Sequence, residues 1–227
     1  RLHTLHALHV LMTARDQGHA VPEQTIAEGL DYLERLLDAK PSTATAYAHY
    51  VLALAGRGQP AQARAQLHSI RGDREARYQL MAAVYLAGDH RYQDELADLS
   101  GFVTGLQGTE REAFRTPLRT QGLVLTTYHS VLDLQDGGLL LAQAVADGLR
   151  GRDARWRSTQ ELAWALSALS PLIRAEPDRA WGLDLRLGDA SVSAEEPSRW
   201  SLVGAAGVES LLLEAPADLP AGLFAVV

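Results

Sequence analysis

The sequence predicts a mainly α-helical fold, an incomplete alpha/alpha toroid of helical hairpins, followed by a small antiparallel β region. Up to Pro177, Leu and Ala recur with the 3.6-residue period of a helix, and short turns marked by Gly or Pro separate the periodic stretches. Beyond Pro177 the period falls to two, as in a half-buried strand. We therefore expect a toroid over residues 1–177 and a β domain over residues 178–227.

Six helices are expected over the first hundred residues, each bounded by a glycine, a proline or a capping side chain. Their expected spans are Leu2 to Gly18, Pro22 to Leu37, Ser42 to Gly56, Pro60 to Leu67, Asp73 to Gly88 and Asp89 to Leu99. The short turns between them are typical of antiparallel hairpins. No fixed residue pattern recurs with the hairpins, and this irregularity favours a toroid over a tetratricopeptide or HEAT array.

The stretch from Gly101 to Arg115 is polar and glycine-rich, and we expect an exposed loop or short ribbon with a weak strand signal at Phe102-Val103. Three further helices are expected after it. Their spans are Thr116 to Leu132, Leu139 to Leu149 and Thr159 to about Arg174.

The best-defined helix is the last one, which begins after Ser158. Ser158 and Glu161 fit a capping box, in which each side chain bonds a backbone N–H of the first turn. Four residues at helical spacing then predict the buried stripe of this helix: Leu162, Ala165, Leu166 and Leu169.

Strand patterns follow Pro177. The expected strands are Trp181 to Leu187, Ser201 to Val203, Val208 to Leu213 and Leu223 to Val227. These few strands cannot form a closed sandwich by themselves. We therefore expect the sheet to include strands from outside this stretch of the chain.

Composition excludes several classes of function. The net charge of -7 argues against a nucleic-acid-binding surface, which needs a concentrated basic patch. The absence of cysteine excludes disulfides, thiolate metal sites and a cysteine nucleophile from this chain. No apolar run approaches the ~20 residues that span a bilayer, so we expect no direct membrane insertion. The chain opens at Arg1 in helical register with no capping residue before it, and we expect a segment of a longer protein.

Candidate chemical groups are few. His3, His6 and His9 lie beside the leucine stripe of the first helix, and we interpret them as histidines at the boundary of a buried face; weak metal chelation is the alternative. Two acidic pairs are interpreted as solvated, with a glycosidase pair as the alternative: Asp94 with Glu95, and Glu110 with Glu112. Six aromatic residues are interpreted as packing between helices, with a ligand-binding box as the alternative: Tyr47, Tyr50, Tyr78, Tyr85, Trp156 and Trp164.

No nucleophile elbow and no phosphate-binding glycine motif is present. The sequence therefore predicts no catalytic, cofactor-binding or metal-ligating residue, no cofactor and no enzyme activity.

Four segments in order along the chain resemble bacterial alpha-2-macroglobulins. Ala46–Arg57 (AYAHYVLALAGR) resembles their A-Y-x-x-Y-V-L-A-x-A-G helix, and Leu80–Asp89 (LMAAVYLAGD) is similar to their L-A-A-A-Y-x-L-A-G-D segment. Arg119–Leu125 (RTQGLVL) stands where the family has R-x-x-A-L-x-L. Ser158–Leu166 (STQELAWAL) resembles S-T-Q-x-x-A-W-x-L, the most specific of the four. The resemblance covers most of Leu33–Leu169.

The resemblance implies a thioester-domain toroid inserted in a CUB-like β domain of a protease inhibitor in the bacterial periplasm or cell envelope. Such proteins trap proteases after cleavage of a bait region, and many acylate the protease through an internal Cys–Gln thioester. The implied partners are target proteases, met through the full-length parent, and the other domains of that parent.

The thioester motif Cys-x-Glu-Gln is absent from this chain, so no functional residue can be assigned from the family. Two other interpretations stay open. One is an enzyme on a toroid, such as a glycosidase or a cyclase, and the other is a helical-repeat adaptor.

Overall fold

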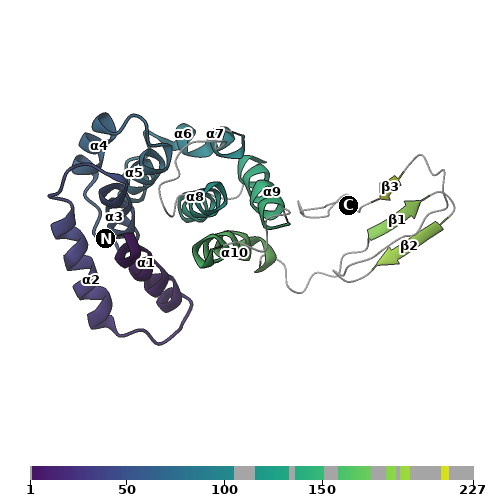
Figure 1. Cartoon of the computed structure of the whole chain (residues 1–227), viewed down its shortest axis with the longest axis horizontal. Helices are drawn as coiled ribbons and strands as arrows, with labels where there is room; N and C mark the ends of the chain where they lie inside the picture. Colours follow the sequence, from purple (N-terminus) through teal and green to yellow (C-terminus); the bar gives the residue numbers. More distant parts are fainter. Residues whose placement is uncertain are drawn as a thin grey trace. The chain divides into compact units, whose positions relative to one another are not determined.

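The computed structural model describes residues 2–104, 116–132, 136–150 and 158–174 and three strands, at 183–187, 190–194 and 211–214. The chain forms two compact units, Arg1–Leu169 and Ser170–Val227. The described residues form ten helices (Figure 1). These are α1 (Leu2–Asp16), α2 (Glu23–Leu36), α3 (Thr43–Leu54), α4 (Pro60–Ser69), α5 (Arg74–Leu86), α6 (Gln93–Ala97), α7 (Ser100–Val103), α8 (Pro117–Val131), α9 (Asp136–Arg150) and α10 (Thr159–Arg174).

Five helices form an inner ring. Helices α1, α3, α5 and α8 pack side by side in that order. Helix α10 closes the ring, because Trp164 lies against α1 on one side and its backbone lies against Gly122 of α8 on the other. Helices α2, α4 and α9 cover α1 and α3, α5, and α8 respectively, as an outer layer (Figure 1). The helical unit is consistent with the predicted alpha/alpha toroid.

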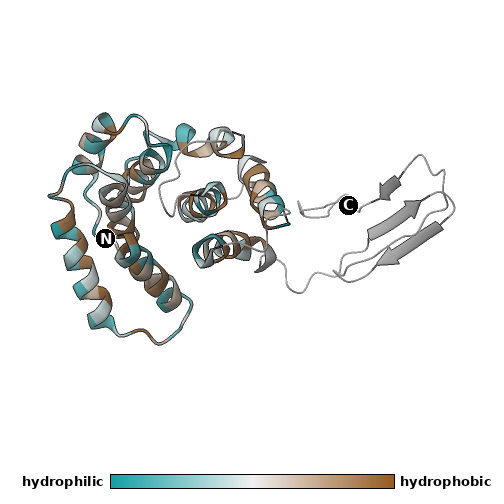
Figure 2. Cartoon of the chain, in the orientation of Figure 1, coloured by the Kyte–Doolittle hydropathy of each residue, from teal (hydrophilic) through white to brown (hydrophobic). Residues whose placement is uncertain are grey.

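Hydrophobicity separates the two layers. Helix α3 buries nine consecutive residues, Thr45 to Ala53, because it is enclosed on all sides. Helix α2 buries a single stripe formed by Ile26, Leu30, Leu33 and Leu36, and its other face is polar. Figure 2 shows the alternation of hydrophilic and hydrophobic colour along α2.

The predicted caps hold the inner helices in place. Ser158 and Glu161 form the predicted capping box: the Glu161 N–H donates to Ser158 Oγ at 3.2 Å, and the Ser158 N–H donates to Glu161 Oε2 at 2.7 Å. Asp73 accepts from the Ala76 N–H at 3.1 Å and also from the Thr43 hydroxyl at 2.6 Å. Asp73 therefore joins the N-termini of α3 and α5, which run parallel.

The stripe predicted for the last helix is wrong at two positions. Leu162 and Leu166 are 39% and 60% exposed. The residues that α10 buries are Glu161, Trp164, Ala165 and Ala168. The large Trp164 side chain enters the ring, and this turns the two leucines outward.

Three local predictions need correction. Asp89 caps no helix: α6 begins at Gln93, and Asp89 instead accepts from Arg64 and Arg91. The strand signal at Phe102-Val103 is wrong, because both residues are helical in α7 and the Phe102 ring packs against Tyr78 at a centroid distance of 5.4 Å. Helix α9 begins at Asp136, three residues earlier than expected. Residues 105–115 of the expected loop lie outside the described residues.

The second unit contains a three-stranded antiparallel sheet of order β2-β1-β3. Its strands are β1 (Leu183–Leu187), β2 (Ala190–Ala194) and β3 (Leu211–Glu214). The register pairs Leu185 with Val192 on one side and with Leu213 on the other. The sequence did not predict β2. The expected strands at 201–203 and 223–227 lie outside the described residues.

Candidate functional site

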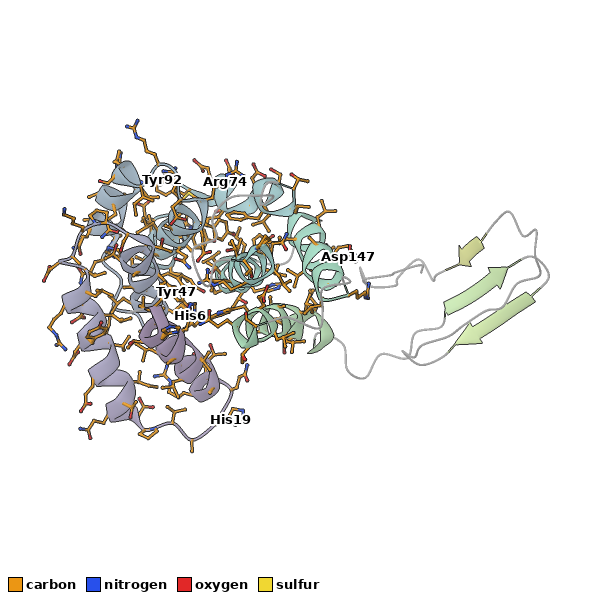
Figure 3. The ribbon with its side chains drawn as sticks, viewed as in Figure 1. His6, His19, Tyr47, Arg74, Tyr92 and Asp147 are labelled. Atoms are coloured by element: carbon orange, nitrogen blue, oxygen red, sulfur yellow. The ribbon has the colours of Figure 1, made fainter. Side chains whose placement is uncertain are left out.

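A buried polar and aromatic cluster lies where the five inner helices meet, and we refer to it as the central cluster. Its members are His6 and His9 of α1, Tyr47 and Tyr50 of α3, Glu75 of α5, Arg119 and Thr120 of α8, and Trp164 of α10. None of these side chains is more than 9% exposed. Figure 3 labels His6 and Tyr47, whose side chains point toward each other inside the ring. The ring is therefore held together at its centre by polar and aromatic groups.

An ion pair joins α5 to α8. Arg119 Nη1 donates to both carboxylate oxygens of Glu75, at 2.5 and 2.6 Å. The Thr120 hydroxyl donates to Glu75 Oε2 at 2.7 Å. Because both charged side chains are 2% exposed, neither has water to replace a lost partner, and each depends on the other for its burial.

Arg119 also joins α8 to α1. Its Nη2 donates to His6 Nε2 at 3.1 Å. A guanidinium has donors and no acceptor, so His6 must be neutral, with its proton on Nδ1. Burial and then the positive charge of Arg119 lower the pKa of His6 to about 3.

His9 joins α1 to α3. Its Nδ1 lies 2.8 Å from the Tyr47 hydroxyl. Burial lowers the pKa of His9 to about 4, and burial raises the pKa of Tyr47. Both groups are therefore uncharged across the ordinary pH range.

Helix α10 covers the two histidines. The Trp164 ring lies 5.3 Å from the His6 ring and 5.2 Å from the His9 ring, between centroids. Gly122 permits this approach, because a Cβ at that position would lie 2.7 Å from the Trp164 carbonyl carbon and 2.8 Å from the Ala165 nitrogen. The seam between α1 and α10 therefore consists mainly of aromatic contacts between Trp164 and histidines.

This geometry can be compared with known proteins. No family model and no curated protein matches the chain. Solved structures do match it, each over 85% of this chain: Salmonella alpha-2-macroglobulin reacted with methylamine, at 23% identity and a TM-score of 0.62, and native Escherichia coli alpha-2-macroglobulin from domain MG7 to the C-terminus, at 20% identity and a TM-score of 0.63. A third is the Escherichia coli protein activated by porcine elastase, at 21% identity and a TM-score of 0.62.

The chain has the fold of a segment of bacterial alpha-2-macroglobulin. It spans 13% of the Salmonella chain, 18% of the elastase-activated chain and 32% of the chain that begins at MG7. The resemblance inferred from the four sequence segments is thus matched by a likeness in fold to alpha-2-macroglobulin structures.

On this alpha-2-macroglobulin fold, the predicted boundary histidines divide. His3 is exposed, and it lies 3.4 Å from the Gln160 side chain of α10. The interpretation is wrong for His6 and His9, which are 9% and 4% exposed, because α10 covers the face that the sequence alone leaves open. Within the described residues, no group of three or more His, Cys, Asp or Glu side chains could hold a metal ion.

The acidic pairs and aromatic residues have distinct positions. Asp94 and Glu95 are exposed on α6, and Glu110 and Glu112 lie outside the described residues, as does Trp156. The packing role is confirmed for the buried residues Tyr47, Tyr50, Tyr78 and Trp164. Tyr85 is partly exposed and stacks on His90 at 4.3 Å between centroids.

The sequence did not identify Glu75, Arg119 or Thr120 as members of the cluster. Charged residues are rarely fully buried, so periodicity assigns Glu75 and Arg119 to a solvated face. The segment Arg119–Leu125 was noted for its resemblance, but that pattern does not give the arginine a partner. In the part of the chain that the structure describes, no helix is long and apolar enough to cross a membrane.

Proposed function

We propose that the chain is a non-catalytic segment of a bacterial alpha-2-macroglobulin-like protein that traps proteases. The observation that carries the proposal is the likeness in fold over 85% of the chain to the native protein and to the protein activated by porcine elastase. The four sequence segments in family order support it independently of the fold.

Within that protein, residues 1–177 would form the later part of the thioester-like toroid, and residues 178–227 part of a CUB-like β domain. A thioester in the parent would need a cysteine from outside this chain, since none is present here. The matched Salmonella protein was reacted with methylamine, an amine that opens a thioester by forming an amide and releasing a thiol. The proposed location is the periplasm or cell envelope.

The central cluster argues against the enzyme interpretation. A glycosidase needs two carboxylates facing each other across a cleft. The cluster contributes one carboxylate, Glu75, and its oxygens already bind Arg119 and Thr120. The adaptor interpretation predicts an open solenoid, whereas α10 closes the inner helices into a ring.

The test uses the full-length protein that contains this segment. Elastase is added in substoichiometric amount, and its activity is measured on casein and on a small chromogenic peptide. A trapped protease loses activity on casein because a large substrate cannot reach it, but it keeps activity on the peptide. The native gel should also show a single mobility shift.

Elastase inactivated at its catalytic serine is the control, because it can bind but cannot cleave. It should cause no mobility shift. Full casein activity together with unchanged mobility would contradict the proposal. Equal loss of activity on both substrates would also contradict it, because that result indicates a blocked active site rather than a trap.

A further inference from the structure

Helix α10 covers the histidines of the central cluster along one of its faces. Trp164 of α10 lies over both His6 and His9, with ring centroids 5.3 and 5.2 Å away. The other face of α10 is exposed, with Leu162 39% and Leu166 60% accessible. Helix α10 is therefore held to the ring along one face, and its departure would give water access to both histidines.

The closed ring favours the neutral form of both histidines, because both are buried. His6 Nε2 must be unprotonated to accept from Arg119 Nη2, and protonation would place two donors against each other. Both oxygens of Glu75 accept hydrogen bonds from Arg119 or Thr120, and no hydrogen bond joins Glu75 to His6 among the described residues.

The titratable and charged neighbours of His6 and His9 come from several packed helices. Helix α1 adds His3, α3 adds Tyr47 and Tyr50, α5 adds Glu75, and α8 adds Arg119. From α10 the ring in contact is that of Trp164, which carries no charge, and the buried carboxylate of the same helix is Glu161, which accepts from the Ser158 N–H. Proton uptake by His6 in the closed ring thus adds positive charge next to Arg119 in a buried site.

We propose that α10 is an acid-released lid on the inner ring, which separates from α1 when His6 and His9 take up protons. The proposal concerns this chain alone and does not rest on the protease-trap function. Because α10 would lose its packing on leaving the ring, and an isolated helix of this length is marginal in water, its backbone amides would then exchange with solvent.

Proton linkage gives the size of the effect. The closed state holds the pKa of His6 at about 3 and that of His9 at about 4, whereas a solvated histidine has a pKa of about 6.5. Between pH 6 and pH 5 only the open state binds these protons. Each histidine therefore multiplies the opening constant by up to about tenfold per pH unit, and the two together by up to about hundredfold.

The experiment is amide hydrogen exchange of the full 227-residue chain between pH 5 and pH 6, corrected for intrinsic exchange rates. The logarithm of the protection factor of the α10 amides should fall as the pH is lowered, with a slope of nearly two per pH unit, which corresponds to the uptake of two protons. His6→Gln or His9→Gln should reduce the slope to one, and the double variant should abolish it, since glutamine is polar and does not titrate. His68→Gln, at an exposed position on α4, is the matched control and should leave the slope at two.

The amides of α3 are the reference for global unfolding. Global unfolding would expose the buried His49 to protonation as well, and it would lower the protection of the α3 and α10 amides in parallel. The proposal is overturned if α3 loses protection together with α10, or if the double variant keeps the slope of the unmodified chain. If His6→Gln does not fold, the reduction of the slope from two to one in His9→Gln alone decides the question.

Discussion

Arg119 and His6 are 113 positions apart in the chain, yet Arg119 Nη2 donates to His6 Nε2 across 3.1 Å inside the ring. The same guanidinium binds Glu75, so one side chain joins α1, α5 and α8. Its two partners, His6 and Glu75, differ in charge and in their position in the sequence. We infer that Arg119 fixes the relative positions of the inner helices, because a hydrogen bond depends on direction and apolar packing does not.

Replacing Arg119 by Met should lower the free energy of unfolding by about 3–5 kcal/mol, because it leaves the Glu75 carboxylate buried without its partner. The double variant Glu75→Met with Arg119→Met should recover most of this loss, because it removes both charges. Urea unfolding followed by circular dichroism measures both values. Equal loss in the single and double variants would show that the charge pair is not the source of the effect.

An exposed pair supplies the control for this comparison. Arg57 Nη2 donates to Asp31 Oδ1 at 2.8 Å, and both side chains are partly exposed. Arg57→Met should leave the urea midpoint close to that of the unmodified chain, because water replaces the lost partner.

Gly122→Ala should destabilise the ring by about 1–3 kcal/mol, because the new Cβ meets backbone atoms that cannot rotate away. The nearest are the Trp164 carbonyl carbon at 2.7 Å and the Ala165 nitrogen at 2.8 Å. In a domain of this size the expected fall in melting temperature is about 2–4 °C per kcal/mol. Gly72→Ala is the matched control, since an added Cβ there meets nothing within 4 Å. An unchanged melting temperature for Gly122→Ala would contradict the close contact, because it would mean that α8 and α10 lie farther apart than these distances indicate.

Local signals in the sequence predicted local structure well. Ser158 with Glu161 and Asp73 with Ala76 form the caps that their spacing indicates, because a cap involves residues three positions apart. The leucine stripe of α10 failed for the opposite reason. Which face is buried depends on α1 and α8, and the sequence near Leu162 contains no information about them.

The candidate site was less predictable than the helices. His6 and His9 were noted from their spacing, but their burial depends on Trp164, more than 150 positions away, and that contact has no pattern in the sequence. Strand β2 was missed although Gly188-Asp189 separates it from β1, and a two-residue link that begins with Gly indicates a hairpin. That signal was available in the sequence.

Ser158→Ala should destabilise α10 by about 1 kcal/mol, because it removes the oxygen that accepts from the Glu161 N–H at 3.2 Å. Amide exchange should show the loss in α10 and leave α3 unchanged. Ser42→Ala, at the cap of α3, is the comparison, because the Ser42 side chain makes the same bond to the Thr45 N–H at 3.3 Å. Its effect should appear in α3. Loss of protection spread evenly over both helices in both variants would contradict local capping.

His49→Leu should stabilise the chain, with a gain that grows as the pH falls. His49 is 0% exposed, and neither ring nitrogen has a hydrogen-bond partner among the described residues. Removing a buried polar group that has no partner should raise the free energy of unfolding by about 1–3 kcal/mol at neutral pH.

Burial also lowers the pKa of His49 to about 4, below the ordinary 6.5, so the unfolded chain binds a proton there that the folded chain does not. The free energy of unfolding contributed by this site is therefore complete above pH 6.5 and falls as the pH drops toward 4. Urea midpoints at pH 7 and pH 5 should thus differ less in His49→Leu than in the unmodified chain, whereas His68→Leu, at an exposed position, should leave that difference as it is. A variant that is less stable at both pH values would show that His49 has a polar partner in the folded protein.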